Sequence, residues 1–177
     1  MQHFIEIMIS KARWLLVIRG LGTTLLIAVC AVLIGSILGC IFALMKISKN
    51  KILNGIANVY TTIIRGIPMA TQLMIFYFVV FSPLGFSNNV VVAIIAFGIN
   101  SGAYCTEIFR AGIQGVDKGQ MEAGRSLGLS WWQTLVKIIL PQAIRTILPT
   151  YTSEFITMIK ATSVASFIPV VDLQKAC

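Results

Sequence analysis

One uncharged stretch limits what this chain can fold into. From Gly20 to Met45 the sequence contains no Asp, Glu, Lys, Arg or His. As a helix, this stretch of about 26 residues is about 39 Å long at ~1.5 Å per residue, which exceeds the ~30 Å hydrocarbon core of a bilayer. A second run, from Gly66 to Thr106, also lacks these residues and is long enough for two crossings. Only 11% of all residues are charged, against about 25% in soluble domains. We therefore expect a membrane protein.

A turn divides the second uncharged run. Pro83 and Gly85 lie in a Ser- and Asn-rich segment that is typical of a tight connection between two helices. With the first run and a later apolar stretch, the sequence predicts an all-α polytopic membrane helix bundle, formed as a single transmembrane domain over residues 1–177. Its spans are expected at about 20–45, 55–81, 90–110 and 138–158. The last of these contains prolines and charges, so it has to face protein or water rather than lipid.

The basic residues predict the orientation of this bundle. Lysines at 46, 49 and 51 follow the first span, and a second basic segment, from Arg110 to Lys137, follows the third. The positive-inside rule places both on the cytoplasmic side, so that residues of about 112–137 form a cytoplasmic loop. The net charge of +8 comes from basic residues that are scattered singly. Because they form no stripe that would follow phosphates, we expect no nucleic-acid partner.

The residue types needed for several common chemistries are missing from the sequence. His3 is the only histidine, and the four cysteines have no spacing typical of metal ligands. No Gly-rich phosphate-binding motif that ends in Gly-Lys-Ser/Thr occurs in the sequence. We therefore expect no metal site, no cofactor and no enzymatic activity in this chain, and any nucleotide it depends on has to be bound by another subunit.

The expected cytoplasmic loop carries signals for two short helices. Asp117 is placed to cap a first helix that ends at Gly128, and Ser130 with Gln133 forms a capping-box pattern for a second. Stiff, capped connections of this kind can carry a push from a soluble partner into the membrane. The alternative is a connector that rests on the bilayer surface.

Polar residues inside the expected spans are candidates for a transport path. Glu154 in the fourth span and Asn100 in the third supply a carboxylate and an amide in apolar surroundings. Together they are suited to a cationic or amide-bearing amino acid, although a hydrogen bond between the two helices is the alternative.

Two arginines near the spans have different expected roles. Arg65 and Pro68 predict a kink in the second span, with Arg65 either fixed at the cytoplasmic mouth of the bundle or extended to lipid headgroups. Arg145 precedes Glu154 by nine positions on the same helix, so we expect Arg145 at a different depth, near the inner interface.

A set of linked motifs resembles a known family. Glu122, Ala123 and Gly124, followed by Gly128 and by Ile139-Leu140-Pro141, resemble the cytoplasmic coupling signature of bacterial ABC importer permease subunits. Flanking segments are similar to the polar amino acid subfamily of histidine, glutamine and arginine type, among them Arg65-Gly66-Ile67-Pro68, Asn100-Ser101-Gly102-Ala103-Tyr104, Glu107-Ile108-Phe109-Arg110 and Pro141-Gln142-Ala143. The resemblance extends from about Gly20 to Asp172.

The resemblance implies roles for particular residues. Glu122 and Ala123 would face a cytoplasmic ATPase with Gly128 at the turn, and Gly124 stands where the family usually has Ala. This glycine is expected to loosen the helix by up to about 1 kcal/mol. Asn100 and Glu154 would line the substrate path, with Gln72 and Tyr104 as further candidates. Family chains usually continue past residues 160–166 into another transmembrane helix, so the expected bundle lacks that last helix.

The function that the resemblance implies is that of a membrane-spanning permease subunit of an ATP-driven amino acid importer. Its expected partners are the ABC ATPase that binds ATP, a second identical or related permease chain, an extracytoplasmic amino-acid-binding protein and membrane lipids. Its expected location is the bacterial plasma membrane, which it crosses several times. The alternative is an ion-coupled secondary carrier or channel, in which Glu154 relays a proton or cation. One Glu and one Asn leave open which amino acid is carried.

Overall fold

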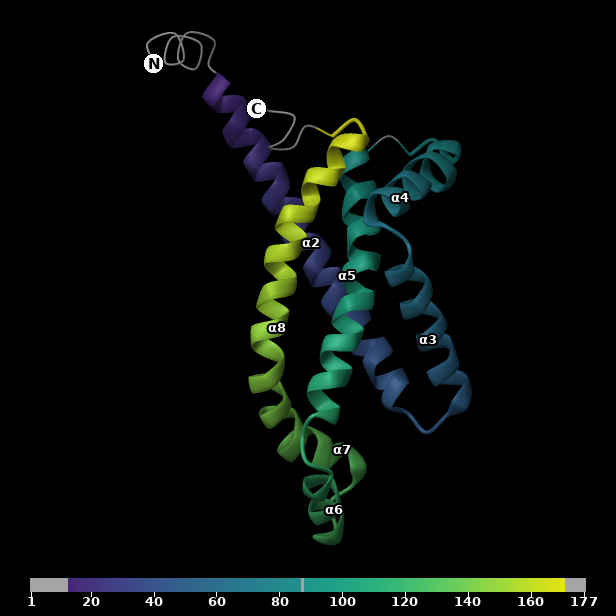
Figure 1. Cartoon of the computed structure of the whole chain (residues 1–177), viewed down its shortest axis with the longest axis vertical. Coiled ribbons are helices and arrows are strands. Elements are labelled where there is room, and N and C mark those ends of the chain that lie inside the picture. The colour runs from purple at the N-terminus through teal and green to yellow at the C-terminus, as the bar shows by residue number, and fades with distance from the viewer. Residues whose placement is uncertain (1–12, 87, 171–177) are drawn as a thin grey trace.

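A computed structural model describes residues 13–86 and 88–170, and every regular element in these ranges is helical (Figure 1). The all-α fold class predicted from the sequence is therefore confirmed. The elements are α2 (Arg13–Ile47), α3 (Lys51–Gly66), α4 (Met69–Met74) with the π-helical turns η1 (Ile75–Phe81) and the 3₁₀ turn η2 (Ser82–Leu84), α5 (Asn89–Gln114), α6 (Lys118–Ser126), α7 (Trp131–Thr134), the π-helical turn η3 (Leu135–Ile139), α8 (Leu140–Ala161) and the 3₁₀ segment η4 (Thr162–Phe167).

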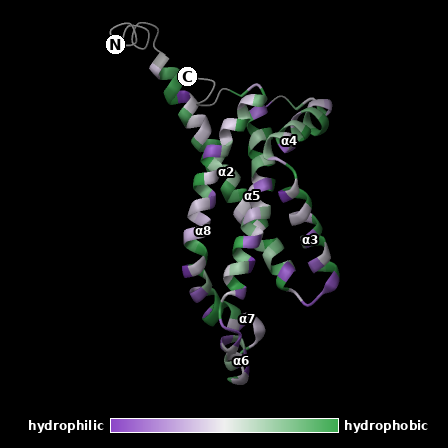
Figure 2. Cartoon of the chain, in the orientation of Figure 1, coloured by the Kyte–Doolittle hydropathy of each residue, from purple (hydrophilic) through white to green (hydrophobic). Residues whose placement is uncertain are grey.

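The helices α2, α5 and α8 form the long axis of the molecule. In Figure 1, α6 and α7 lie at one end, together with the turn between α2 and α3, and the start of α2 and the end of α8 lie at the other. Figure 2 shows that α2 and α5 are largely hydrophobic, whereas hydrophilic residues gather at the α2–α3 turn and around α6. This distribution places the lysines and arginines of both basic segments at one end of the bundle.

Two of the described helices, α2 and α5, are long and apolar enough to cross a membrane by length and composition. The pair Lys51–Gly66 and Met69–Leu84 adds a third if it is one broken span. The expected fourth span, 138–158, lies in the helical run through α8, which is not among these candidates. Its crossing of the membrane stays a prediction.

The second expected span, 55–81, is broken into two helices at the place where the sequence predicts a kink. Its helices begin at Lys51, where the Asn50 side chain caps α3, and bend by 103° at the break before Met69. The kink predicted from Pro68 is confirmed and is sharper than a simple bend, because Ile67 is extended (φ −102°). Pro68 has no N–H to donate to the Ile64 carbonyl four residues earlier. The Gln72 Nε2 donates to that carbonyl instead, at 3.0 Å.

Small residues bring α2 and α5 into close contact. A Cβ atom added to Gly39 would lie 2.5 Å from the Cβ of Cys105, and one added to Gly35 would lie 2.7 Å from the Cβ of Ser101. Such glycine strips let two helix backbones approach closely in a membrane bundle. The core on this contact includes the fully buried side chains of Ile27 and Phe97. Gly35 and Gly39, four positions apart on α2, thus form a strip without side chains that faces α5.

The connection between α5 and the last helix is shorter than the expected loop, 112–137. Helix α5 continues to Gln114, and a continuous helical run already begins at Trp131 and passes through η3 into α8. The capping box of Ser130 and Gln133 starts this run. The wider π-helical turns of η3 end at Ile139, so Pro141 lies in the first turn of α8, where proline is tolerated.

Candidate functional site

A cavity of about 430 Å³ lies where the bend between α3 and α4 meets α5 and α8. Its walls contain five residues that the sequence singled out: Arg65, Pro68, Asn100, Tyr104 and Glu154. Three separate segments of the chain supply them, so the fold brings together side chains that are up to 89 positions apart. The cavity therefore combines a cation, a carboxylate and an amide inside a mostly apolar bundle.

The two charges of the cavity are held in different ways. The Arg65 guanidinium lies over the ring of Tyr104, with its central carbon 5.1 Å from the ring centroid, which is a cation–π arrangement. The carboxylate of Glu154 accepts a hydrogen bond from the Ser101 hydroxyl at 3.3 Å. Among the described residues no ion pair within 4.0 Å involves Arg65 or Glu154. Both charges thus remain available to a ligand in the cavity.

Asn100 and Gln72 form the polar wall behind this cavity. Asn100 is 5% exposed and its Nδ2 donates to the Gln72 Oε1 at 2.7 Å. Gln72 is 3% exposed and does not line the cavity. The alternative hydrogen bond between Asn100 and Glu154 is not formed, because Asn100 turns to Gln72 while Glu154 pairs with Ser101. Gln72 therefore orients Asn100 and also holds the broken end of α3.

Arg145 lies outside the cavity. Its side chain is exposed on α8 and makes no ion pair within 4.0 Å with any described residue, Glu154 included. The separation of nine positions along one helix, about 13.5 Å at ~1.5 Å per residue, accounts for this arrangement.

The helix α6 has the caps that the sequence predicts. The Asp117 Oδ1 accepts from the Gly119 N–H at 2.6 Å. At the other end, the N–H groups of Gly128 and Leu129 donate to the carbonyls of Arg125 and Gly124, and Gly128 has a φ of 83°. This pattern is a Schellman motif, in which glycine adopts the left-handed conformation at low cost. The capping box that opens α7 is also present in both directions.

The residues expected to face an ATPase divide into two groups on α6. Glu122 and Ala123 are exposed, as is Gly128 at the turn. Gly124 is buried, and a Cβ atom added there would lie 2.5 Å from the Cγ2 of Thr134. The expectation that Gly124 merely loosens the helix is therefore incomplete, because this glycine also lets α6 approach the start of the last helix.

Sequence reasoning did not assign a role to an ionic cluster at the same end of the molecule. The Lys46 ammonium at the end of α2 pairs with the Oε1 of Glu107 on α5, and the Arg110 guanidinium pairs with the Oε2 at 2.7 Å. The side chain of Lys46 is 9% exposed. The first uncharged run is followed directly by Lys46 and the second directly by Glu107. These two opposite charges at the ends of the runs were the signal available in the sequence.

Comparisons with known proteins agree with this arrangement. Residues 31–169 match the family described as binding-protein-dependent transport system inner membrane component. The chain belongs to this family of transport permeases. It is 41% identical over 162 residues to a putative glutamine transport system permease protein, GlnP, of Rickettsia prowazekii (strain Madrid E), covering 91% of the chain and 74% of that relative. It is 43% identical over 158 residues to a probable amino-acid ABC transporter permease protein, YckA, of Bacillus subtilis (strain 168), covering 89% and 70%.

A solved structure shares the fold of this permease. It is described as an amino acid ABC transporter with histidines and superimposes with a TM-score of 0.85 at 40% identity. The match covers 94% of this chain and 78% of that one. The polytopic permease bundle inferred from the linked motifs around Glu122 is therefore confirmed as the family and fold of this membrane component.

Proposed function

We propose that this chain is the membrane-spanning permease subunit of an ATP-driven amino acid importer. In this function the cavity around Arg65 and Glu154 takes the amino acid, and α6 receives movement from a cytoplasmic ATPase that binds the ATP. Two permease chains, identical or related, surround the path, and an extracytoplasmic binding protein delivers the substrate. The chain crosses a bacterial plasma membrane several times with α6 on the inner side.

The observation that carries this proposal is one continuous helical run from Trp131 to Ala161. At its beginning, Thr134 packs against Gly124 of α6. Toward its other end, Glu154, Thr157 and Met158 form one wall of the cavity. The twenty positions from Thr134 to Glu154 correspond to about 30 Å of helix. A continuous helical run of this length gives a displacement of α6 a path to the wall of the cavity.

The chemistry of the cavity supports an amino acid as its substrate. An amino acid carries an ammonium and a carboxylate, which are matched by the carboxylate of Glu154 and the guanidinium of Arg65. Asn100 adds an amide held in place by Gln72. The volume of about 430 Å³ lies within the range of ~300–1,000 Å³ that is common for small-molecule sites. Relatives carry names of glutamine and arginine transport permeases, and both substrates are compatible with this set of groups.

Transport by reconstituted complexes tests the proposal. The permease is placed in proteoliposomes with its ATPase, and uptake of labelled glutamine and arginine is measured without an ion gradient. We expect uptake only with ATP and the binding protein. Glu154→Gln removes the carboxylate that pairs with the ammonium of the substrate. It should reduce uptake at least tenfold, because a charge-assisted hydrogen bond contributes about 1.5–3 kcal/mol. Thr152→Ala on the exposed face of the same helix is the matched control. Gradient-driven uptake without ATP would instead support the secondary carrier and contradict the proposal.

The coupling role of α6 is tested separately through Glu122. Glu122→Lys reverses the charge of an exposed residue without touching the buried Gly124 contact. We expect the ATPase to co-purify less with this variant, while substrate binding to the cavity is unchanged. Equal recovery of the ATPase with native and variant permease would show that α6 is not its docking element.

A further inference from the structure

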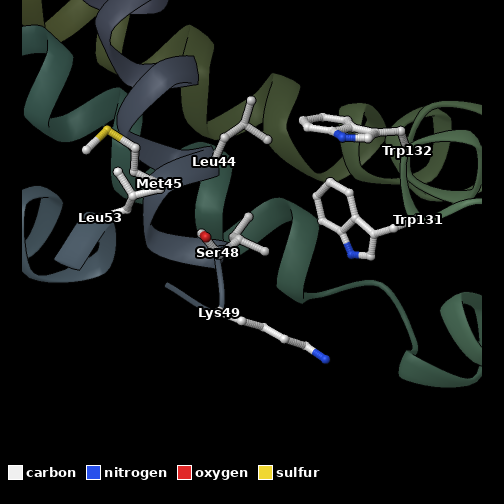
Figure 3. Close-up of a pocket in the computed structure, with 8 residues that line it drawn as sticks. Leu44, Met45, Ser48, Lys49, Leu53, Trp131 and Trp132 are labelled. Carbon is white, nitrogen blue, oxygen red and sulfur yellow. The ribbon is translucent and has the colours of Figure 1, made fainter. Parts of the chain in front are cut away.

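A second cavity, of about 440 Å³, lies at the end of the molecule that carries α6 (Figure 3). It is bounded by the end of α2, the start of α3 and the first turn of α7. Six of its eight lining residues are apolar or aromatic, namely Leu44, Met45, Ile47, Leu53, Trp131 and Trp132. The other two are Ser48 and Lys49. None of these eight residues lines the cavity of the transport function proposed above, although Trp131 and Trp132 begin the helical run on which that function rests.

The polar and apolar residues of this cavity are separated along it. In Figure 3, Leu44, Met45 and Trp132 lie toward one end, Ser48 lies between, and the Lys49 side chain extends away at the other end. Lys49 has no ion pair among the described residues. Lys46, one turn earlier, differs because Glu107 neutralises it. Lys49 thus supplies an uncompensated positive charge at the mouth of an apolar cavity.

A smaller cavity of about 280 Å³ adjoins the first one. The two share Leu44 and Trp132, and the smaller cavity is lined only by apolar residues and Cys40. Two apolar spaces that share a wall and have one cationic end match a molecule with two hydrocarbon chains and an anionic head. A small water-soluble anion would contact Lys49 but would leave both apolar spaces without a partner.

We propose that these cavities bind one anionic phospholipid of the inner leaflet. The headgroup phosphate is held by the Lys49 ammonium and the Ser48 hydroxyl, and the acyl chains lie on either side of Leu44 and Trp132. Tryptophan is enriched at the membrane–water interface, and basic pockets on the cytoplasmic side favour anionic headgroups. Both features occur here on the end of the bundle that the basic residues place inside.

The bound lipid also contacts the element that joins α6 to the last helix. Trp131 and Trp132 are the first residues of α7, directly after the capping residue Ser130. Trp131 in addition lines a cavity with Lys118 and Met121 of α6. A phospholipid in this position therefore braces the start of the helical run that α6 packs against.

Fluorescence quenching by brominated lipids tests this site. The protein has three tryptophans, so Trp14→Phe leaves only Trp131 and Trp132 as reporters. This variant is reconstituted in vesicles of phosphatidylcholine that contain either dibrominated phosphatidylglycerol or dibrominated phosphatidylcholine. We expect the quenching constant for phosphatidylglycerol to be about fivefold higher, the factor that corresponds to about 1 kcal/mol for one basic residue at an anionic surface.

Three further variants test whether Lys49 is the source of the preference for phosphatidylglycerol. Lys49→Ala should lower the ratio of the two quenching constants, phosphatidylglycerol to phosphatidylcholine, to about one. Lys49→Arg keeps the charge and should retain the fivefold ratio. Lys137→Ala removes a lysine that is exposed on η3, on the same basic side but outside the cavity, and should also leave the ratio unchanged. An unaltered ratio in Lys49→Ala, or an equal loss in Lys137→Ala, would overturn the proposal. Loss of the preference in the presence of millimolar glycerol phosphate would show a soluble-anion site instead.

Discussion

Replacing Gly124 with alanine measures how closely α6 packs against the last helix. A Cβ atom at this position would lie 2.5 Å from the Cγ2 and 2.9 Å from the Oγ1 of Thr134. Carbon atoms in contact are normally ~3.5–4.0 Å apart, so one partner has to move by about 1 Å. Thr134 cannot yield easily, because its side chain is 0% exposed and its hydroxyl donates to the Ser130 carbonyl at 3.0 Å.

Two opposing effects determine how much Gly124→Ala changes the stability of α6. Alanine is about 1 kcal/mol more favourable than glycine inside a helix, whereas overpacking a tight contact costs about 1–3 kcal/mol. We therefore expect Gly124→Ala to destabilise α6 against local opening by about 1 kcal/mol. This change corresponds to roughly fivefold faster amide exchange in the helix. An exposed glycine would show the opposite sign, with slower exchange.

Hydrogen–deuterium exchange of the peptide that covers residues 118–129 is the assay. The Thr134→Ala background removes the two closest atoms that the new methyl group would meet and leaves the flexible end of Ile138, with its Cδ1 at 3.2 Å. In that background we expect Gly124→Ala to slow exchange, because only the helix propensity remains. The difference between the two backgrounds is the coupling energy of the contact. If Gly124→Ala slowed exchange equally in both backgrounds, the close approach of α6 to Thr134 would be refuted.

Two further substitutions test the packing of the bundle by thermal unfolding in detergent. Gly39→Ala places a Cβ atom 2.5 Å from that of Cys105 and should lower the free energy of unfolding by about 1–3 kcal/mol. Gly55→Ala is the control, because no atom lies within 4 Å of its new Cβ, and it should be neutral or stabilising. Equal effects of the two substitutions would contradict the close α2–α5 contact. Gln72→Leu leaves the Ile64 carbonyl and the Asn100 amide without their hydrogen-bond partner. It should lower the free energy of unfolding by about 1–3 kcal/mol for each of these groups that stays buried. Gln142→Leu, at an exposed position, is its control. An equally small effect at both positions would contradict the role of Gln72 in holding Asn100 and the end of α3.

The ends of the short helices were predictable because capping is a local rule. Asp117, Ser130 with Gln133, and Gly128 each act on backbone groups within five positions. The break at Pro68 was predictable for the same reason, since proline removes a donor at a known place. Its angle of 103° was not, because it depends on how the following helix packs against α5. Local chemistry therefore indicates where a helix stops, and tertiary packing determines where the chain goes next.

The composition of the cavity was predictable, but the pairing of its residues was not. Polar residues in apolar spans pointed to Asn100 and Glu154, whose surroundings depend on which helix faces meet. The partner of each lies on another helix, Gln72 for Asn100 and Ser101 for Glu154. Ser101 had no signal of its own, because a serine is common in close helix contacts. The pair of Lys46 and Glu107 was missed because 61 positions separate its members.

The bend at Pro68 explains why two polar residues of one segment have different environments. Arg65 and Gln72 are seven positions apart, so a straight helix would place them on nearly the same face. Instead, the break leaves Arg65 exposed at the cavity and Gln72 3% exposed behind it. The carbonyl that the proline leaves without a donor is the one that fixes Gln72, and Gln72 in turn orients Asn100. The break thus builds the polar wall of the cavity as well as its mouth, because the group that repairs the backbone is also the group that positions the amide.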